Sequence, residues 1–389
     1  MIVHVFNSSV VSGPEKLVLP ALARAPGQYL IVNLVETRLI RPGAADPLEA
    51  YCRSLGLPYQ ALPVRGRWDR TAMRALADLL RAREPRLVHA HVGKASVYLS
   101  RCRGALKAGT PLVSTHHGVR GLPDLKTRLY ELLYRRVFLR RFDRVLCVST
   151  EDFDAVRRSG LDAGKVRLHL NGVDGRRLDA AARRAERPAI RSAWLGPDAR
   201  EDLFLFGVVG RLSREKDHDR LLRVLAELQR LGAPADWRCV VLGAGALERP
   251  LKETARRLGL DRRVVWLGYR EDAGRELAGL DLLLSFSKAE GLPVNLIEAG
   301  WAGTPAAATL VGGVKDLLPD DAFGTGIPPG EPADKTARRL AALLAPPGRD
   351  ALEAQGRRFQ ERVAERFSRA RWLARLGEIY DELGVRLEP

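Results

Sequence analysis

The sequence predicts an α/β protein with two doubly wound domains in tandem, and three observations support this prediction. The chain has 389 residues, which is long for one common domain and enough for two that each bury a core. Short apolar runs alternate with helical stretches, as in parallel sheets that helices cover on both faces. A polar segment rich in Arg and Ala, 174–202, separates two such series.

The first series predicts a parallel sheet in the N-terminal half. Its strand-like runs are 2–6, 29–35, 86–91, 111–115, 144–149 and 166–170. Ligands of doubly wound domains bind beyond the carboxyl ends of the strands. In the first such loop, "NSSVVSGPEKLVLPAL", Gly13 allows a backbone to come close to a ligand. The loop "THHGVRG" places His116 and His117 at another strand end, where we interpret them as functional rather than core residues.

The second series predicts a second sheet, from the runs 203–210, 238–243, 263–268, 281–287 and 304–309. Its first loop begins at Gly210, which permits a tight exit from the strand, and contains Arg211 and Lys216. A helix follows, with Asp217 as its expected N-cap and apolar residues at 221, 222, 224, 225 and 228. Two cations beside a helix N-terminus favour a phosphate or diphosphate site. The alternative is that they are solvated charges in an Arg-rich protein.

Two further patterns are weak evidence for a binding site when taken by themselves. Gly243 begins a G-x-G after the run 238–243, but a tight strand-to-helix turn needs glycine in any case. D-x-D occurs at 152–154 and at 217–219, both at the starts of predicted helices. Acidic residues there favour the positive end of the helix dipole, so we interpret neither pair as a set of metal ligands.

Composition indicates a soluble globular protein with 46% apolar and 29% charged residues. No apolar run approaches the roughly 20 residues of a membrane span. The start, "MIVHVFNSS", lacks the pattern of a secretory signal. Four cysteines are scattered, and Cys147 and Cys239 lie in strand-like runs, where buried, reduced thiols are expected. We therefore expect a cytoplasmic protein.

The formal net charge of +17 has two explanations, an anionic partner or, in part, compositional drift in a chain that is also rich in Ala, Leu and Gly. Nucleic acid is disfavoured because aromatic residues make up only 6% and no reading helix is recognisable. The pattern of 123–144 predicts one basic amphipathic helix, and two interpretations are open for what this helix contacts. Its apolar side chains all face the core, or the helix contacts the anionic inner face of a membrane. The apolar positions are Leu125, Leu129, Leu132, Leu133, Val137 and Leu139, and the cations are Lys126, Arg128, Arg135, Arg136, Arg140 and Arg141.

Together these segments resemble a known family. "GRLSREKD", "VVLGAG", "AEGLPVNLIEAGWAGTPAAATLVGGVKDLL" and "GTGIPPGEP" resemble the C-terminal half of GT-B glycosyltransferases of family 4. "SGPEK", "STHHGVRG", "DRVLCVST" and "NGVD" are similar to the N-terminal half. The resemblance implies two Rossmann-like domains facing across a cleft: an acceptor-binding domain, 1–175, and a nucleotide-sugar-binding domain, 176–370. A closing helix, in 371–389, would cross back to the first domain.

The resemblance also implies roles for two glutamates eight positions apart, Glu290 and Glu298. Glu298 would accept hydrogen bonds from the ribose hydroxyls, and Glu290 would face the transferred sugar. Between them, a turn would direct backbone N–H groups to the sugar and diphosphate, ahead of a helix that starts near Pro293. The residues of this turn are Gly291, Leu292, Pro293 and Val294.

Five further positions match family residues. Arg211 and Lys216 would bind the diphosphate in place of a metal, and Tyr269 and Arg270 would lie in the loop against the nucleobase. His117 would lie near the transferred sugar, leaving His116 on the acceptor side. The chain departs from the family pattern at Ser12, where glycine is usual, at Trp301, where a smaller residue is common, and at "DAFGTG".

The function implied is retaining transfer of a sugar from a UDP- or GDP-sugar to a hydroxyl group. The resemblance implies that this transfer is metal-independent and uses no cofactor. The acceptor would be a glycan, a lipid-linked or a small molecule, in envelope polysaccharide or glycoconjugate biosynthesis. The chain shows no pair of carboxylates arranged as in hydrolases, which fits a front-face displacement. Two alternatives stay open: a sugar-nucleotide epimerase of the same fold, and a protein that binds sugar nucleotides without catalysis.

Overall fold

The structure is a computed structural model, and it describes residues 1–37, 46–66, 68–91, 93–117, 132–233 and 236–387. The chain divides into two compact units, which are described separately here. Residues up to 171, together with those from 369 onward, form the first unit, and 172–368 form the second. The borders lie at 171/172 and 368/369, whereas the sequence placed them at 175/176 and 370/371.

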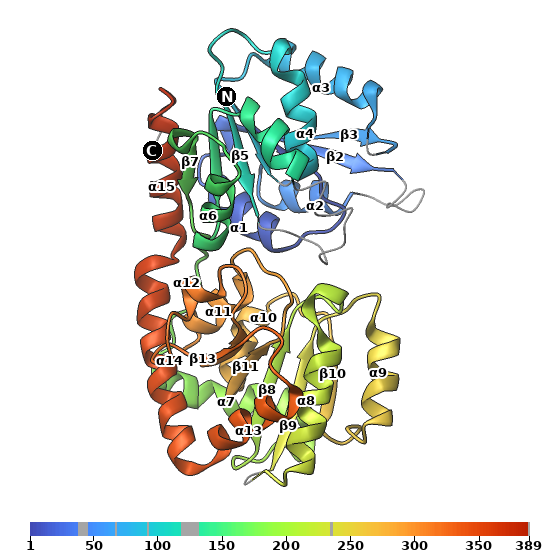
Figure 1. Ribbon diagram of the computed structural model, residues 1–389, viewed down its shortest axis with the longest axis vertical. Helices are drawn as coiled ribbons and strands as arrows, with labels where there is room; N and C mark the ends of the chain where they lie inside the picture. Colours follow the sequence, from blue (N-terminus) through green and yellow to red (C-terminus); the bar gives the residue numbers. More distant parts are fainter. Residues whose placement is uncertain (38–45, 67, 92, 118–131, 234–235, 388–389) are drawn as a thin grey trace. The chain divides into compact units, whose positions relative to one another are not determined.

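The first unit is built on a seven-stranded parallel sheet with the order β3-β2-β1-β4-β5-β6-β7 (Figure 1). Its strands are β1 (Ile2–Phe6), β2 (Tyr29–Glu36), β3 (Tyr59–Val64), β4 (Leu87–His91), β5 (Leu112–His116), β6 (Arg144–Cys147) and β7 (Val166–Leu168). The sequence predicted six of these and missed β3. That strand lies at the sheet edge, is half-exposed and contains Pro63, so it lacks the continuous apolar run of a central strand.

Helices cover this sheet, and one of them comes from the far end of the chain. They are α1 (Gly13–Leu22), α2 (Pro47–Ser54), α3 (Arg70–Arg83), α4 (Gly93–Cys102), α6 (Thr150–Arg158) and α15 (Arg369–Asp381). In α15, Trp372, Leu376, Ile379 and Tyr380 are buried in the first unit. This confirms the prediction that the closing helix returns to the N-terminal domain.

The second unit has a six-stranded parallel sheet with the order β10-β9-β8-β11-β12-β13. Its strands are β8 (Phe204–Val209), β9 (Trp237–Leu242), β10 (Val264–Gly268), β11 (Leu282–Ser285), β12 (Ala306–Thr309) and β13 (Thr325–Ile327). The sequence missed β13, an edge strand of only 3 residues. Its helices are α7 (Ala180–Leu195), α8 (His218–Arg230), α9 (Glu248–Arg257), α10 (Ala273–Glu276), α11 (Val294–Trp301), α12 (Val314–Leu317), α13 (Ala333–Leu344) and α14 (Pro346–Arg366).

The polar segment 174–202, which the sequence places at the boundary between the two domains, lies directly after the border at 171/172 and belongs to the second unit. It contains α7, which packs in the second unit through Trp194 and the buried Arg191. The Arg191 guanidinium donates to the carbonyls of Gly279 and Leu203, at 2.9 and 2.8 Å, and pairs with Asp281. An arginine within a polar stretch of the sequence is thus buried and links three segments of this unit through hydrogen bonds and an ion pair.

Both units have the apolar cores that the periodicity predicted. On α8, the five apolar positions named from the sequence, 221, 222, 224, 225 and 228, are all buried. All four cysteines are buried and free, as expected for Cys147 and Cys239. None of the helices in the described residues combines the length and apolar character needed to cross a bilayer.

Candidate active site

The strand order of the second unit reverses between β8 and β11, and several predicted site residues follow these two strands. Strands β9 and β10 extend the sheet on one side, and β12 and β13 on the other. The loops after β8 and β11 therefore leave the same sheet edge at a topological switch point, where ligands of such sheets bind. Arg211 and Lys216 lie in the first loop, and Glu290 in the second.

Lys216 and Glu290 are in direct contact although they are 74 positions apart. The Lys216 ammonium lies 2.5 Å from Oε1 of Glu290, and the Ser287 hydroxyl donates to the same oxygen at 2.6 Å. The Glu290 side chain is only 11% exposed. The fold thus brings one predicted diphosphate cation and the predicted sugar-facing carboxylate to one place.

A second set of contacts ties the two loops together. The Lys288 amide donates to the Glu215 carbonyl at 2.8 Å, and the Lys288 ammonium lies 3.1 Å from the Asp217 carboxylate. Asp217 occupies the N-cap position of α8, as predicted, but its side chain makes no capping hydrogen bond. Its backbone is left-handed, with φ +49°, and its carboxylate turns to Lys288 instead. The expected capping role was therefore wrong.

The two glutamates stand on either side of a helix start, as the sequence predicted. Helix α11 begins at Val294 with Pro293 as its N-cap, so Glu290 precedes the helix and Glu298 lies in its second turn. The Asn295 amide donates to the carbonyl of Val209, the last residue of β8, at 2.7 Å. Sequence reasoning singled out neither Asn295 nor Ser287. A polar residue within the apolar run "PVNLIEA" was the available signal.

Glycines allow the loops at this edge to approach one another. A Cβ at Gly312 would lie 1.9 Å from the Glu290 carbonyl oxygen, and a Cβ at Gly243 would lie 1.9 Å from that of Gly210. Gly243 is therefore explained by backbone packing against the loop after β8.

The remaining predicted residues of this unit lie around α10. Tyr269 and Arg270 directly follow β10, and Arg270 Nε lies 3.7 Å from the Glu276 carboxylate on α10. The Glu298 side chain packs close to Gly274 on the same helix. The Arg211 side chain is 56% exposed and lies 3.4 Å from Glu215. Among the described contacts, none joins Arg211 to the Lys216–Glu290 pair.

In the first unit, Gly13 begins α1, after the strand at which that sheet also reverses. Ser12, which departs from the family's usual glycine, has a capping function. Its hydroxyl and its amide donate to the Glu15 carboxylate at 2.7 and 2.9 Å. Glu15 is buried and also accepts a hydrogen bond from the Ser8 hydroxyl.

His117 and His116 lie at the end of β5, and both are buried. The His117 ring is 5.9 Å from that of His91. His116 Nε2 is 3.7 Å from the Asp152 carboxylate, while burial and the nearby Arg135 lower the pKa of His116 to about 3. Asp152 lies in the first turn of α6 and Asp154 just beyond it, near the helix start as predicted, and Ser149 Oγ accepts from the Asp152 amide.

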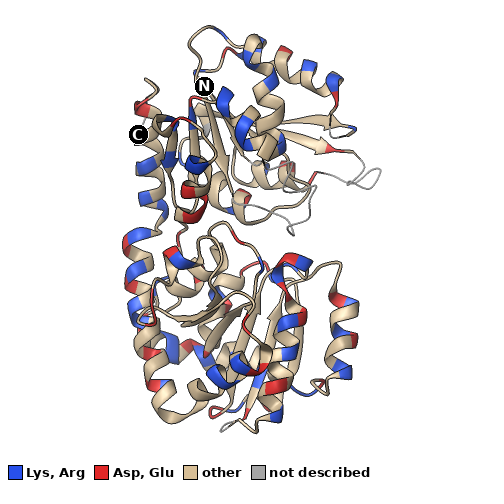
Figure 2. Ribbon diagram, viewed as in Figure 1, with Lys and Arg blue, Asp and Glu red and all other residues tan. Residues whose placement is uncertain are grey.

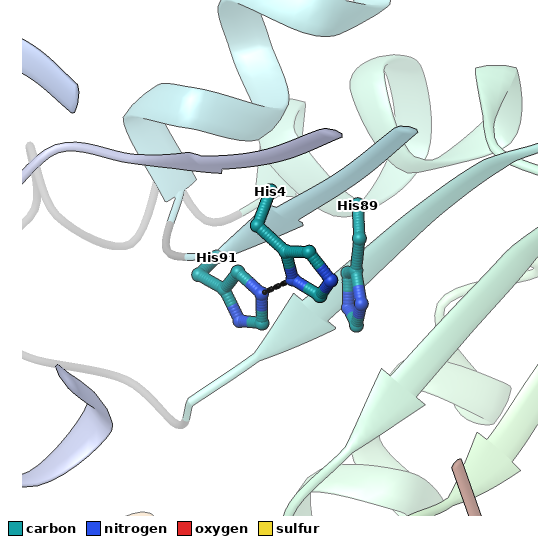
Figure 3. Close-up of side chains that lie close together, drawn as sticks. All are labelled: His4, His89 and His91. Carbon is teal, nitrogen blue, oxygen red and sulfur yellow. Dashed lines mark hydrogen bonds between the residues drawn. The ribbon is translucent and has the colours of Figure 1, made fainter. Parts of the chain in front are cut away.

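Three further buried histidines, His4, His89 and His91, form a stack on β1 and β4 (Figure 3). Their ring nitrogens come within 4.8 Å of one another, the spacing of a metal site. His4 Nδ1 and His91 Nε2, however, hydrogen-bond each other at 2.9 Å, and His89 uses both nitrogens, with Tyr380 and Thr115 at 2.7 Å. The group contains no anionic ligand to balance a buried dication. We interpret it as a hydrogen-bonded stack of neutral imidazoles, signalled in the sequence by histidines within apolar strands.

The described part of 123–144 contradicts the interpretation that all its apolar side chains face the core. Leu132, Leu133 and Val137 are 44%, 47% and 48% exposed, while Leu139 is buried. Arg136 and Arg140 are exposed beside them. The segment is also not one helix to 144, since a π-helical turn, Tyr134–Phe138, and a 3₁₀ turn, Leu139–Arg141, precede β6. The other predicted positions, Leu125, Leu129, Lys126 and Arg128, lie outside the described residues.

Comparisons with known proteins identify relatives of both halves. A family model for glycosyl transferases group 1 matches residues 196–359, and one for Glycosyltransferase Family 4 matches residues 27–177. UDP-Gal:alpha-D-GlcNAc-diphosphoundecaprenol alpha-1,3-galactosyltransferase of Escherichia coli is 25% identical and aligns over 83% of this chain and 82% of its own length. D-inositol 3-phosphate glycosyltransferase of Salinispora arenicola is 32% identical, over 79% of this chain and 72% of its own.

Solved structures agree with the two-domain fold. Crystal structures of Anabaena Alr3699/HepE in complex with UDP and with UDP-glucose match with TM-scores of 0.79 and 0.78. Both are 20% identical and cover 98% of this chain and 99% of theirs. With the sheets of seven and six parallel strands, this likeness establishes two Rossmann-like domains.

Proposed function

Because the chain belongs to glycosyltransferase family 4 and is a glycosyltransferase, we propose that it transfers a sugar from a UDP-sugar to a hydroxyl of a glycan or lipid-linked acceptor. The HepE structures hold UDP and UDP-glucose, and the E. coli relative is named for UDP-Gal, which supports a UDP-sugar over a GDP-sugar. That relative is also named for a diphosphoundecaprenol acceptor, which supports a lipid-linked acceptor and a role in envelope polysaccharide or glycoconjugate assembly.

The contact between Lys216 and Glu290 at the switch point carries this proposal. The two ends of a sugar diphosphate need opposite partners, a cation for the phosphates and an acceptor for the sugar hydroxyls. Lys216, with Arg211, would face the diphosphate, and Glu290 the sugar. Glu298, in the second turn of α11, would accept from the ribose hydroxyls, while Tyr269 and Arg270 would lie against the base. His117 would lie near the transferred sugar.

We propose a retaining transfer that needs no metal. The acceptor oxygen bonds to the anomeric carbon on the face from which the diphosphate leaves. The bond from that carbon to the phosphate oxygen breaks, and the acceptor proton passes to the departing phosphate. Negative charge develops on the diphosphate during this step, so a fixed ammonium beside it stabilises the transition state more than the ground state.

A donor-binding experiment tests the proposal. Among UDP-, GDP- and ADP-sugars, a UDP-sugar should raise the melting temperature most, because a ligand of the native state stabilises it. Glu298→Ala should raise the donor KM by about 10- to 100-fold with little change in kcat, since hydrogen bonds to a carboxylate are worth roughly 1.5–3 kcal/mol and are similar in both states. The control is Glu253→Ala, which removes a carboxylate that is exposed on α9 and should leave the donor KM unchanged.

Three outcomes would contradict parts of this proposal. Conversion of the donor to an isomeric sugar nucleotide without an acceptor would identify an epimerase. Donor binding with no consumption in the presence of acceptors would identify a binding protein. An unchanged KM in Glu298→Ala would show that the ribose assignment is wrong.

We also propose that the exposed apolar and basic side chains of the first unit contact an anionic membrane surface. The combination favours a lipid interface, because apolar groups enter the headgroup region while each nearby cation adds roughly 1 kcal/mol. The surface consists of Leu132, Leu133, Val137, Arg136 and Arg140. It would bring a lipid-linked acceptor to the enzyme.

The protein should therefore sediment with vesicles that contain anionic lipid at low salt and be released as salt rises. Arg136→Glu with Arg140→Glu should weaken binding at least tenfold. Arg249→Glu with Arg256→Glu, a matched reversal on α9, should not. Vesicle binding that does not depend on salt would contradict the proposed membrane contact. Binding that stays unchanged in Arg136→Glu with Arg140→Glu would contradict it as well.

A further inference from the structure

A second charged site lies in the second unit, between α7 and α14. A cavity of about 60 Å³ is lined there by Arg183, Arg184 and Arg187 of α7 and by Glu353, Arg357 and Gln360 of α14. We call these residues the arginine pocket. Both helices carry basic residues on several turns (Figure 2). None of the six belongs to the proposed donor site.

The pocket holds four guanidinium groups against one carboxylate, that of Glu353. On α7, Arg183 and Arg184 lie one turn before Arg187, so the three cations share one helix face and repel one another. Arg187 pairs with Asp281, but Arg191 pairs with the same carboxylate. The local positive charge is therefore incompletely balanced by side chains among the described residues.

Arg183, one of the lining residues, is held by hydrogen bonds to the backbone. Its two terminal nitrogens donate to the carbonyls of Gly303, at 2.9 Å, and Leu280, at 2.5 Å. Its third guanidinium nitrogen, Nε, is buried, and the N–H there has no acceptor among the described residues. Burial and the neighbouring Arg187 lower the pKa of Arg183 to about 10, while the carboxylates of Asp281 and Glu353 oppose this shift.

We propose that the arginine pocket binds a phosphate group. A phosphate offers several acceptor oxygens and a double negative charge, which match the guanidinium donors of the exposed Arg184 and Arg357 and the Nε–H of Arg183. Guanidinium groups from two helices that line a cavity of this size suit a compact phosphate better than an extended polyanion. Binding joins α7 to α14 and thereby stabilises the second unit.

Thermal unfolding with inorganic phosphate tests this proposal. Phosphate at about twenty times its Kd should raise the melting temperature by about 2–4 °C over sodium chloride of equal ionic strength. The shift should persist in Lys216→Ala, which removes a phosphate contact of the donor site. It should be lost in Arg184→Ala/Arg357→Ala, which removes two exposed arginines that line the cavity. Glycerol 3-phosphate in parallel distinguishes a phosphomonoester, which should bind more tightly, from free phosphate.

The matched control is Arg249→Ala/Arg256→Ala, which removes two exposed arginines from α9 of the same unit and should keep the full shift. Arg184→Lys/Arg357→Lys keeps the charge but loses the bidentate donor geometry of the guanidinium groups. This variant should retain only part of the phosphate-induced rise in melting temperature. The proposal is overturned if the pocket alanine variant keeps the wild-type shift, or if phosphate does no more than chloride in the wild type.

Discussion

Replacing Lys216 with alanine is expected to lower kcat at saturating donor by about 10²- to 10³-fold, the usual effect of removing one preorganised group directed at developing charge. The ammonium is held 2.5 Å from Glu290 at the strand-order reversal, so it is in place before the diphosphate begins to leave. If it only helped to bind the donor, KM would rise and kcat would not. Steady-state kinetics with a UDP-sugar separate the two cases.

Companion variants make this test specific. Arg211→Ala should show a fall of similar size, and Arg211→Lys should recover only partly, because an ammonium lacks the guanidinium fork. Magnesium should rescue neither if transfer is independent of metal. Lys252→Ala is the control, since this lysine forms a comparable ion pair with Glu248, at 2.7 Å, away from the site. A folded Arg211→Ala/Lys216→Ala protein with near-normal kcat would refute the catalytic assignment.

Mild acid is expected to destabilise the first unit strongly. Six of the seven histidines lie in it, and five have depressed pKa values because burial disfavours the charged imidazole. These pKa values are about 3 for His4 and His116, about 4 for His169, and well below 6.5 for His89 and His91. Well above pH 6.5, the pKa of a histidine in the unfolded chain, the imidazoles are neutral in both the folded and the unfolded state. The free energy of unfolding therefore does not change with their titration there. As pH falls below 6.5 the unfolded chain takes up protons and the native state does not, until the folded pKa values are reached.

The size of this effect follows from proton linkage. At pH 5.5 each such histidine lowers the free energy of unfolding by about 1.4 kcal/mol, so five together cost several kcal/mol, comparable with the whole stability of a domain. The test is urea unfolding between pH 7.5 and 5.5, with hydrogen exchange to follow each unit. The first unit should open before the second, because His218 is the second unit's single histidine.

Variants that cannot titrate provide the check. His4→Gln/His91→Gln should lower the slope of unfolding free energy against pH by about two protons, whatever it does to stability at pH 7.5. His218→Gln should leave the slope of the first unit unchanged. A first unit equally stable at pH 7.5 and 5.5 would show that the buried imidazoles do not control its acid response.

The sequence by itself determined the features that depend on neighbouring residues. Apolar period predicted the central strands and the buried face of α8, and the turn before Val294 placed Glu290 ahead of a helix and Glu298 in its second turn. It missed β3 and β13, since edge strands are short or half-exposed and lack a continuous apolar run.

Only the tertiary structure decided which distant groups meet. Strand order sets β8 beside β11, and that adjacency brings Lys216 to Glu290. It likewise sets β1 beside β4 and stacks His4 with His91, and the packing of α7 on α14 assembles the arginine pocket. The exposure of Leu133 and Val137 depends equally on what packs beside them. Helix and strand periods extend over a few residues, whereas these contacts arise from the order in which strands pair and helices dock, which no local pattern specifies.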